Sequence, residues 1–327
     1  MVNEANATWR AVRERDYHPE SFLNDEYLNA PDPIPTGIHP LDAILSGGMR
    51  PGLHVLGGEP GAGKSALALQ ICHNVVRAGG AALYFSIEMS CSQCVFRLLS
   101  LVSSEMEEAG RGKAFKFSHV GQYARSTKEC FLQAKQAGGD LMAEAENSFG
   151  DPVALAHATY EQDYKRLAVV DDVNTLDGIR DLVKDVTEAQ IKPLVVIDYL
   201  HIVGLADGAA SDATTRVGDI TRGLDLMGKE RGIPVLALSA LARSSRGDMH
   251  GFRDSSTIEY AGLSCLVLSK DKDDPEGVVR LSVVKNRFGP FGDDYSIPLA
   301  YDRPHNRFTE TVETRSVPTR VGGGAMT

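Results

Sequence analysis

The chain has 327 residues, of which 43% are hydrophobic and 24% are charged, as in ordinary globular proteins. Its net charge of −10 argues against a protein that coats nucleic acid with its whole surface, although a ring can hold a small basic channel inside an acidic exterior. No window approaches the ~18 uninterrupted apolar residues of a membrane span, and the N-terminus lacks the features of a signal peptide. Together with five irregularly spaced cysteines, which indicate reduced thiols, this predicts a cytoplasmic protein without membrane contact.

Composition divides the chain into three parts. Residues 1–35 are polar, end in a proline-rich stretch and predict an N-terminal extension or linker. Residues 36–310 alternate short apolar runs with longer amphipathic stretches, except over 104–162, where a mainly helical insertion is predicted. Residues 311–327 include three consecutive glycines, and we expect a disordered tail.

Secondary structure in the middle part follows from its hydrophobic pattern. Apolar residues recur at helical spacing over 65–77, where we expect a helix. Strands alternating with helices predict an α/β fold with a mostly parallel sheet covered by helices on both faces. The predicted strands are 53–56, 81–85, 194–197, 235–238, 263–268 and 278–284, with a further short candidate at 113–118.

A loop between a predicted strand and a predicted helix fits the pattern G-x-x-x-x-G-K-[ST] of the phosphate-binding P-loop. Glycines let backbone N–H groups approach phosphate oxygens, and the following helix N-terminus adds a favourable dipole. Lys64 is predicted to reach the β- and γ-phosphates of ATP, and Ser65 to ligate Mg²⁺. A chance match is expected in about one or two per cent of chains of this length. The loop residues are Gly58, Glu59, Pro60, Gly61, Ala62, Gly63, Lys64 and Ser65.

Two carboxylates follow predicted strands and are candidates for ATP chemistry. A P-loop needs an acid that orients Mg²⁺ at the end of a neighbouring strand, and Asp198 ends an apolar run. The alternative for Asp198 is an ordinary helix N-cap. Hydrolysis also needs a group that orients or deprotonates the attacking water. Glu88 follows the strand expected next to the P-loop strand, and its alternative is a solvated surface side chain.

Several segments together resemble the C-terminal ATPase domain of the DnaB-type replicative helicases, within the RecA-like P-loop superfamily. The resemblance covers about residues 36–308 and implies a RecA-like P-loop core with a late β-hairpin. Beside the P-loop, the matching segments are 36–42, 47–52, 85–90, 97–100, 196–200, 232–239 and 285–292.

The resemblance implies roles for three further residues. Glu88 is implied as the base that activates water, and Lys285 and Arg287 as cations that reach the γ-phosphate held by the neighbouring subunit. The alternative for the two cations is an ordinary pair of surface side chains beside a turn. Action on a neighbour would place ATP between subunits, and the family implies a head-to-tail ring, expected to be a hexamer, with other replication proteins as partners.

Single-stranded DNA is a further partner that the family implies. In the family, the loops that contact DNA follow the metal-binding strand and the next strand in the chain. The first candidate, 204–215, is small and acidic, whereas the second, 243–253, carries Arg243, Arg246 and Arg253. Arginines in a flexible loop are typical phosphate contacts, and the alternative is a solvated surface loop.

Two functional hypotheses remain open. The first is an ATP-hydrolysing DnaB-like helicase or translocase that acts on single-stranded DNA in replication. The second is a non-unwinding RecA-like ATPase that works as a regulatory switch or as an assembly factor, for example in helicase loading. The hydrolysis residues and the Lys285/Arg287 hairpin favour the first. The acidic charge, the few residues before the ATPase region, and Ala240 at the family's polar γ-phosphate sensor position favour the second.

Overall fold

The computed structural model describes residues 31–110, 114–119, 164–205, 213–240, 262–292 and 294–311. From residue 33 onward, these belong to one compact unit, Pro33–Thr327. Most of the predicted N-terminal extension, most of the predicted insertion, the arginine loop and the tail from residue 312 lie outside the described residues.

A single nine-stranded sheet forms the centre of the unit, in the order β3-β2-β4-β5-β1-β6-β7-β8-β9. The first six strands of this order are parallel, and β7, β8 and β9 continue the sheet in antiparallel fashion. This confirms the predicted α/β fold and the late hairpin. The strands are β1 (Gly52–Gly58), β2 (Ala82–Ser86), β3 (Leu167–Val170), β4 (Leu194–Asp198), β5 (Pro234–Ala240), β6 (Ser264–Ser269), β7 (Val278–Asn286), β8 (Ser296–Asp302) and β9 (Arg307–Glu310).

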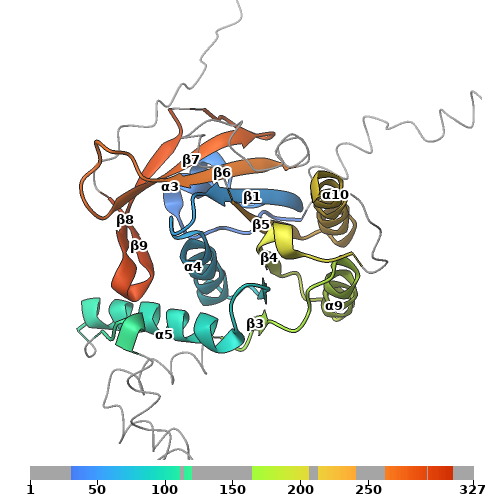
Figure 1. Cartoon of the computed structure of the whole chain (residues 1–327), viewed down its shortest axis with the longest axis horizontal. Helices are drawn as coiled ribbons and strands as arrows, with labels where there is room; N and C mark the ends of the chain where they lie inside the picture. Colours follow the sequence, from blue (N-terminus) through green and yellow to red (C-terminus); the bar gives the residue numbers. More distant parts are fainter. Residues whose placement is uncertain are drawn as a thin grey trace, which may run out of the picture. The chain divides into compact units, whose positions relative to one another are not determined.

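Helices cover both faces of the sheet, which explains why its central strands are apolar throughout (Figure 1). Leu236 and Leu238 of β5 point to one face and join the core under α3, α4 and α5. Their neighbours Val235 and Ala237 point to the other face and join the core under α9 and α10. Among the described helices, none is long and apolar enough to cross a bilayer. The helices are α3 (His39–Ile44), α4 (Lys64–Arg77), α5 (Cys91–Glu108), α9 (Leu176–Glu188) and α10 (Ala213–Arg231), with short 3-10 turns η2 (Phe117–His119), η3 (Leu200–Ile202) and η5 (Arg303–His305).

The order of strands in the sheet differs from the expected one. The sequence predicted that the strands before Asp198 and Glu88 lie next to the P-loop strand, and this is wrong. β1 is flanked by β5 and β6, so β5 separates β4 from β1, and both β4 and β5 separate β2 from β1. Because these strands are parallel, their C-terminal ends still meet along one side of the sheet, which we call the carboxyl edge. The opposite side is the amino edge.

The short strand predicted over 113–118 is also wrong. Phe115 bonds to α5 instead of to a strand, since its N–H donates to Ser103 Oγ at 3.2 Å and its carbonyl accepts from Ser100 Oγ at 2.9 Å. The next residues turn into η2, and no strand occurs within 114–119. α5 itself continues to Glu108, past residue 104 where the predicted insertion begins. β3 and α9 were not predicted.

Candidate active site at the carboxyl edge

The P-loop lies at the carboxyl edge. Gly58 ends β1 between Ala240 of β5 and Leu268 of β6, and α4 begins at Lys64. Gly63 joins loop to helix at a φ of +106°, a conformation that side chains disfavour. A Cβ at this position would lie 2.9 Å from the Tyr301 ring and 3.0 Å from the Phe308 ring, so the close packing also requires glycine.

The side chain of Lys64 folds back into the loop, where its ammonium group is attracted by the charges of both candidate carboxylates. Its Nζ donates to the carbonyl oxygens of Gly58 at 2.8 Å and Glu59 at 3.1 Å. Burial lowers the pKa of Lys64, while the negative charges of Asp198 and Glu88 act in the opposite direction. The fold therefore brings together three residues that are far apart in the sequence.

Asp198 is a buried carboxylate at the end of β4, with only 2% of its surface exposed. The hydroxyl of Tyr84 donates to its Oδ2 at 2.6 Å. Burial, followed by the charge of Asp198, raises the pKa of Tyr84, so this hydroxyl keeps its proton and remains a donor. Tyr84 thus fixes the orientation of the carboxylate. Sequence reasoning missed it, although a tyrosine within a buried strand was a signal that its hydroxyl needs a partner.

Glu88 is exposed in a short turn between two fixed points. Before it, Ser86 is opposite Asp198 in the register of β2 and β4, and the N–H of Ile87 donates to the Asp198 carbonyl at 2.8 Å. After it, Ser90 caps α5 through a reciprocal capping box with Gln93. The turn holds Glu88 just beyond the end of β2, within electrostatic reach of Lys64, and its exposed carboxylate is accessible to a water molecule.

These residue types fit a magnesium nucleotide. The Ser65 hydroxyl and the Asp198 carboxylate are the oxygen ligands that Mg²⁺ prefers, and Mg²⁺ usually takes one or two carboxylates together with phosphate oxygens. Ser65 lies in the first turn of α4, whose N-terminus favours negative charge. The carboxyl edge therefore combines a phosphate-binding loop with a donor set for the metal.

The hairpin of β8 and β9 packs behind the P-loop, and sequence analysis gave no sign of this contact. Tyr301 and Phe308 stack at 4.1 Å between ring centroids. The side chain of Gln70 in α4 bonds to both backbone groups of Phe308, at 2.7 and 2.6 Å. Arg303 Nη1 donates to the Gly61 carbonyl at 3.1 Å. Residues some 240 positions away thus brace the loop and the helix after it.

Lys285 and Arg287 lie at the amino edge, away from the P-loop of their own chain. β7 runs antiparallel to β6, and Cys265 of β6 is level with both Val55 and Lys285. Arg287 is two residues further from the carboxyl edge, and its N–H donates to the Leu263 carbonyl at 2.9 Å. With ~3.3 Å per residue along a strand and ~4.8 Å between strands, the Arg287 backbone lies roughly 20 Å from Gly58. The fold does not bring these cations to the other site residues.

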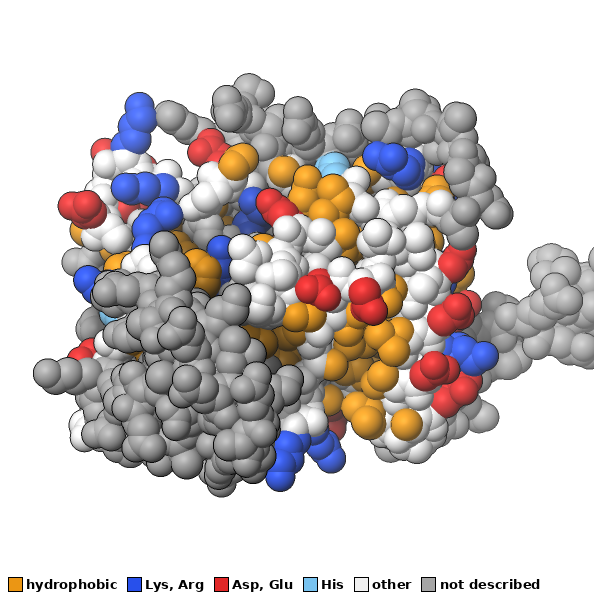
Figure 2. All heavy atoms as spheres, turned by 60° about the horizontal axis from the view of Figure 1, so that its bottom comes forward, with side chains coloured by type: hydrophobic (Ala, Val, Ile, Leu, Met, Phe, Trp, Pro, Cys, Tyr) orange, Lys and Arg blue, Asp and Glu red, His pale blue; other side chains and the backbone are white. Residues whose placement is uncertain are grey.

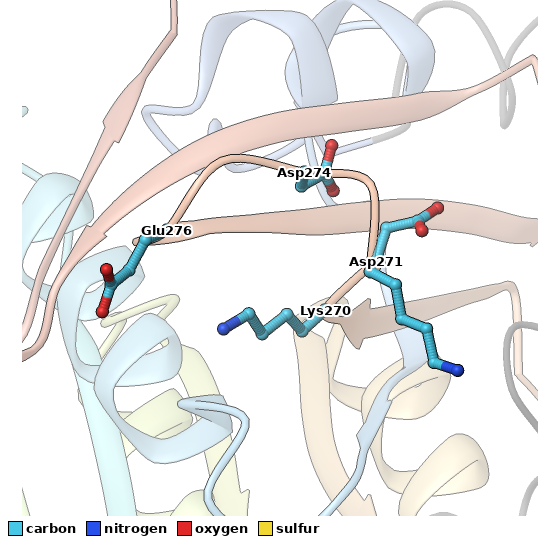
Figure 3. Close-up of a pocket in the computed structure, with 5 residues that line it drawn as sticks. Lys270, Asp271, Asp274 and Glu276 are labelled. Atoms are coloured by element: carbon cyan, nitrogen blue, oxygen red, sulfur yellow. The ribbon is translucent and has the colours of Figure 1, made fainter.

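A polar hollow of about 520 Å³ lies in the loop between β6 and β7, also at the carboxyl edge. Arg280 pairs with Asp274 and thereby fixes this loop. In Figure 3, the labelled lysine and acidic side chains point in different directions and do not converge on a common centre. The hollow is therefore not built as a ligand site. Its lining residues are Lys270, Asp271, Lys272, Asp274 and Glu276.

Known proteins with similar sequences are replicative DNA helicases. The chain is 26% identical over 328 residues to the replicative DNA helicase DnaB of Geobacillus stearothermophilus, covering 95% of this chain and 64% of that protein. It is 26% identical over 287 residues to the replicative DNA helicase DnaC of Bacillus subtilis, covering 84% of this chain and 56% of that protein. The chain thus spans somewhat under two thirds of the length of these relatives.

Solved structures share the fold at lower identity. The ATPase domain of G40P matches with a TM-score of 0.70 and 20% identity over 95% of this chain and 99% of that one. A DnaB-like replicative helicase, solved in a study of its interactions with primase, matches with a TM-score of 0.71 and 20% identity over 90% of this chain and 67% of that one. The family model of the DnaB-like helicase C terminal domain matches residues 33–137 and 141–310. The chain therefore belongs to the DnaB-like helicase C-terminal domain family.

Proposed function

We propose that the chain hydrolyses ATP as a DnaB-like helicase or translocase on single-stranded DNA in replication. The observation that carries the proposal is the division of the catalytic set between the two edges of one sheet. The P-loop, Asp198 and Glu88 share the carboxyl edge, whereas Lys285 and Arg287 lie at the amino edge. One subunit therefore holds an incomplete site, which a second subunit can complete.

Each residue at the carboxyl edge has a distinct task in this proposal. The backbone N–H groups of the loop and the Lys64 ammonium hold the phosphates of ATP. Ser65 and Asp198 would hold Mg²⁺, which supplies positive charge against the phosphate oxygens. Glu88 accepts the proton of the attacking water, and its exposure leaves room for that water.

The cations at the amino edge act on the neighbouring subunit. Charge develops on the γ-phosphoryl oxygens during transfer, and a guanidinium supplied across an interface stabilises it. Contact between the amino edge of one copy and the carboxyl edge of the next is head to tail, and such contacts form a ring where the rotation between subunits closes and a filament where it does not. We propose a hexamer, as in the family, and replication proteins such as primase as partners. We also propose a cytoplasmic location.

Single-stranded DNA is proposed from family membership. The candidate contacts Arg243, Arg246 and Arg253 lie outside the described residues. Acidic side chains gather at the right of the face in Figure 2, on the side where Figure 1 shows α9. α9 exposes Asp177, Asp181, Asp185 and Glu188 against Lys184. An acidic exterior repels phosphates, which favours DNA contact in a central channel.

One observation favours the second hypothesis, a regulatory or assembly ATPase that does not unwind DNA. Ala240 ends β5 directly beside Gly58, next to the P-loop. Its methyl group cannot donate a hydrogen bond to a phosphate, whereas a polar side chain at this position would link the nucleotide to the segment after β5. Without that link, turnover would be insensitive to DNA.

Steady-state ATP turnover with and without single-stranded DNA tests the proposal, with Lys64→Ala as the control for contaminating activity. We expect turnover that DNA stimulates several-fold and that Lys64→Ala abolishes, which would justify a strand-separation assay. Turnover that is equal with and without DNA would refute the motor for the chain alone and support the regulatory ATPase. The Ala240→Gln variant then asks whether a side-chain donor restores stimulation.

A further inference from the structure

Asp171 follows β3 at the carboxyl edge and bonds to the start of α5. Its Oδ2 accepts a hydrogen bond from the N–H of Cys91, the first residue of the helix, at 2.6 Å. The Cys91 thiol donates to the Val169 carbonyl of β3 at 3.2 Å, so the helix and the strand are joined at two points. Figure 1 shows β3 at the edge of the sheet, beside the start of α5. The first N–H groups of a helix have no partner within the helix, so a bond to one of them from outside fixes where the helix begins.

The bond between Asp171 and the Cys91 N–H is assisted by charge. The Cys91 N–H lowers the pKa of Asp171, and the Cys91 thiol acts in the same direction, so the carboxyl group is ionised at neutral pH. An ionised acceptor makes a shorter and stronger hydrogen bond than a neutral one. Negative charge at a helix N-terminus is also favourable to the helix dipole. Asp171 therefore adds to the Ser90–Gln93 capping box a bond that reaches outside the helix, to the neighbouring strand.

The turn of Glu88 lies between this bond and a second attachment on its other side. Before Glu88, the N–H of Ile87 donates to the Asp198 carbonyl at 2.8 Å, which joins the turn to β4. Within the turn, Ser86 Oγ donates to the Met89 carbonyl at 2.7 Å. The side chain of Glu88 is exposed, so the place of its carboxylate depends on the backbone that carries it.

We propose that Asp171 is a positioning residue for ATP hydrolysis, because its bond to the Cys91 N–H sets the place of Glu88 relative to the bound nucleotide. The inference rests on the proposed role of Glu88 as the base that accepts the proton of water. Asp171 acts through Glu88 and takes no proton itself. A base must lie about 3 Å from the group whose proton it accepts, and a displacement of about 1 Å costs about 10²-fold in rate. Loss of the bond should therefore lower kcat and leave MgATP binding at the P-loop intact.

A double-mutant cycle measures whether Asp171 acts through Glu88. Asp171→Ala should lower kcat roughly tenfold to a hundredfold at an unchanged KM for MgATP. In the Glu88→Gln background, the same change should lower kcat by less than about twofold more, because the base that it misplaces is already absent. Asp171→Asn keeps an acceptor oxygen and should retain most of the turnover. The matched structural control is Thr175→Ala, which removes the side-chain cap of α9, 3.2 Å from the Gly178 nitrogen, and should leave kcat unchanged.

Two changes of Cys91 address the same bond from its other end. Cys91→Pro removes the N–H but suits the first position of a helix, where proline is favoured. Ser90 before it already has the extended conformation that a following proline requires, with a ψ of 153°. This variant should lower kcat as Asp171→Ala does, and it keeps the inference testable if Asp171→Ala does not fold. Cys91→Ala keeps the N–H and should keep kcat, and circular dichroism with urea unfolding checks that each variant is folded.

The outcomes separate this inference from the proposed function. If Asp171→Ala keeps the unmodified kcat while Glu88→Gln loses turnover, the positioning role is refuted and the role of Glu88 stands. An equal loss from Asp171→Ala in both backgrounds would also refute it, because Asp171 would then act on the whole fold. A loss with Asp171→Asn as large as with Asp171→Ala would contradict it as well, since the charge would then act directly. If Glu88→Gln keeps full turnover, the proposed base is wrong and this inference fails with it.

Discussion

The position of Arg287 at the amino edge can be tested by mixing two inactive variants. Lys64→Ala removes the phosphate-binding ammonium but keeps the hairpin that serves the neighbour. Arg287→Ala keeps the P-loop but removes the cation offered to the neighbour. Each variant alone is expected to lose turnover, and for Arg287→Ala the loss should be about 10³-fold or more, because loss of an arginine supplied across an interface costs 10³ to 10⁵ in rate.

The expected recovery follows from the distance between the two edges. Arg287 lies roughly 20 Å from the Gly58 of its own chain, so a complete site takes its P-loop and its arginine from different subunits. In a head-to-tail ring formed at random from equal amounts, half of the P-loops are intact, and half of these face an intact Arg287. About one quarter of the sites are then complete, and turnover should rise to about a quarter of the unmodified level.

Phosphate release at constant total protein, over a series of mixing ratios, measures the recovery. Activity should peak at equal amounts and fall towards both pure variants. The matched control mixes Lys64→Ala with Glu88→Gln, since both changes damage the same carboxyl edge and no ring can hold a complete site. If an affinity tag shows that the first pair assembles together while turnover stays at the level of the single variants, the reasoning is refuted.

Three further predictions address single positions. Glu88→Gln should lower turnover by about 10²-fold or more and leave MgATP binding intact, because the amide cannot accept a proton from water; unchanged turnover would exclude Glu88 as the base. Burial lowers the pKa of His54 to about 4, so the unfolded chain takes up a proton first as pH falls below ~6.5. Because of His54, the free energy of unfolding should therefore be about 2 kcal/mol lower at pH 5 than at pH 7. Urea unfolding of His54→Gln should lack this part of the pH dependence. Gly63→Ala should lower the free energy of unfolding by about 1–3 kcal/mol and weaken ATP binding. The control is Gly79→Ala, because Gly79 also has a positive φ, of 86°, but no atom lies within 4 Å of the Cβ that alanine would add. This control should lose stability through backbone strain and keep ATP binding.

Local pattern alone predicted much of the candidate nucleotide site. The P-loop is contiguous, and the strand before it and the helix after it both form as expected. Asp198 is the first polar residue after an apolar run, so the pattern alone places it at the C-terminal end of a strand. Glu88 could be placed just beyond its strand for the same reason, whereas its role as the base came from the resemblance to the family. These features depend on neighbours in the sequence, so hydrophobic period and glycine chemistry were sufficient to find them.

Only the tertiary structure decided which distant residues meet. It inserted β4 and β5 between the strands of Glu88 and the P-loop, and it put Arg287 on the opposite edge from Gly58. It also brought Tyr84 to Asp198, and the β8–β9 hairpin to the back of the P-loop. The physical reason is that the sheet must bury both faces under helices, and many strand orders satisfy the same pattern of apolar residues along the chain. The choice among these orders depends on packing between segments hundreds of residues apart, which no local pattern records.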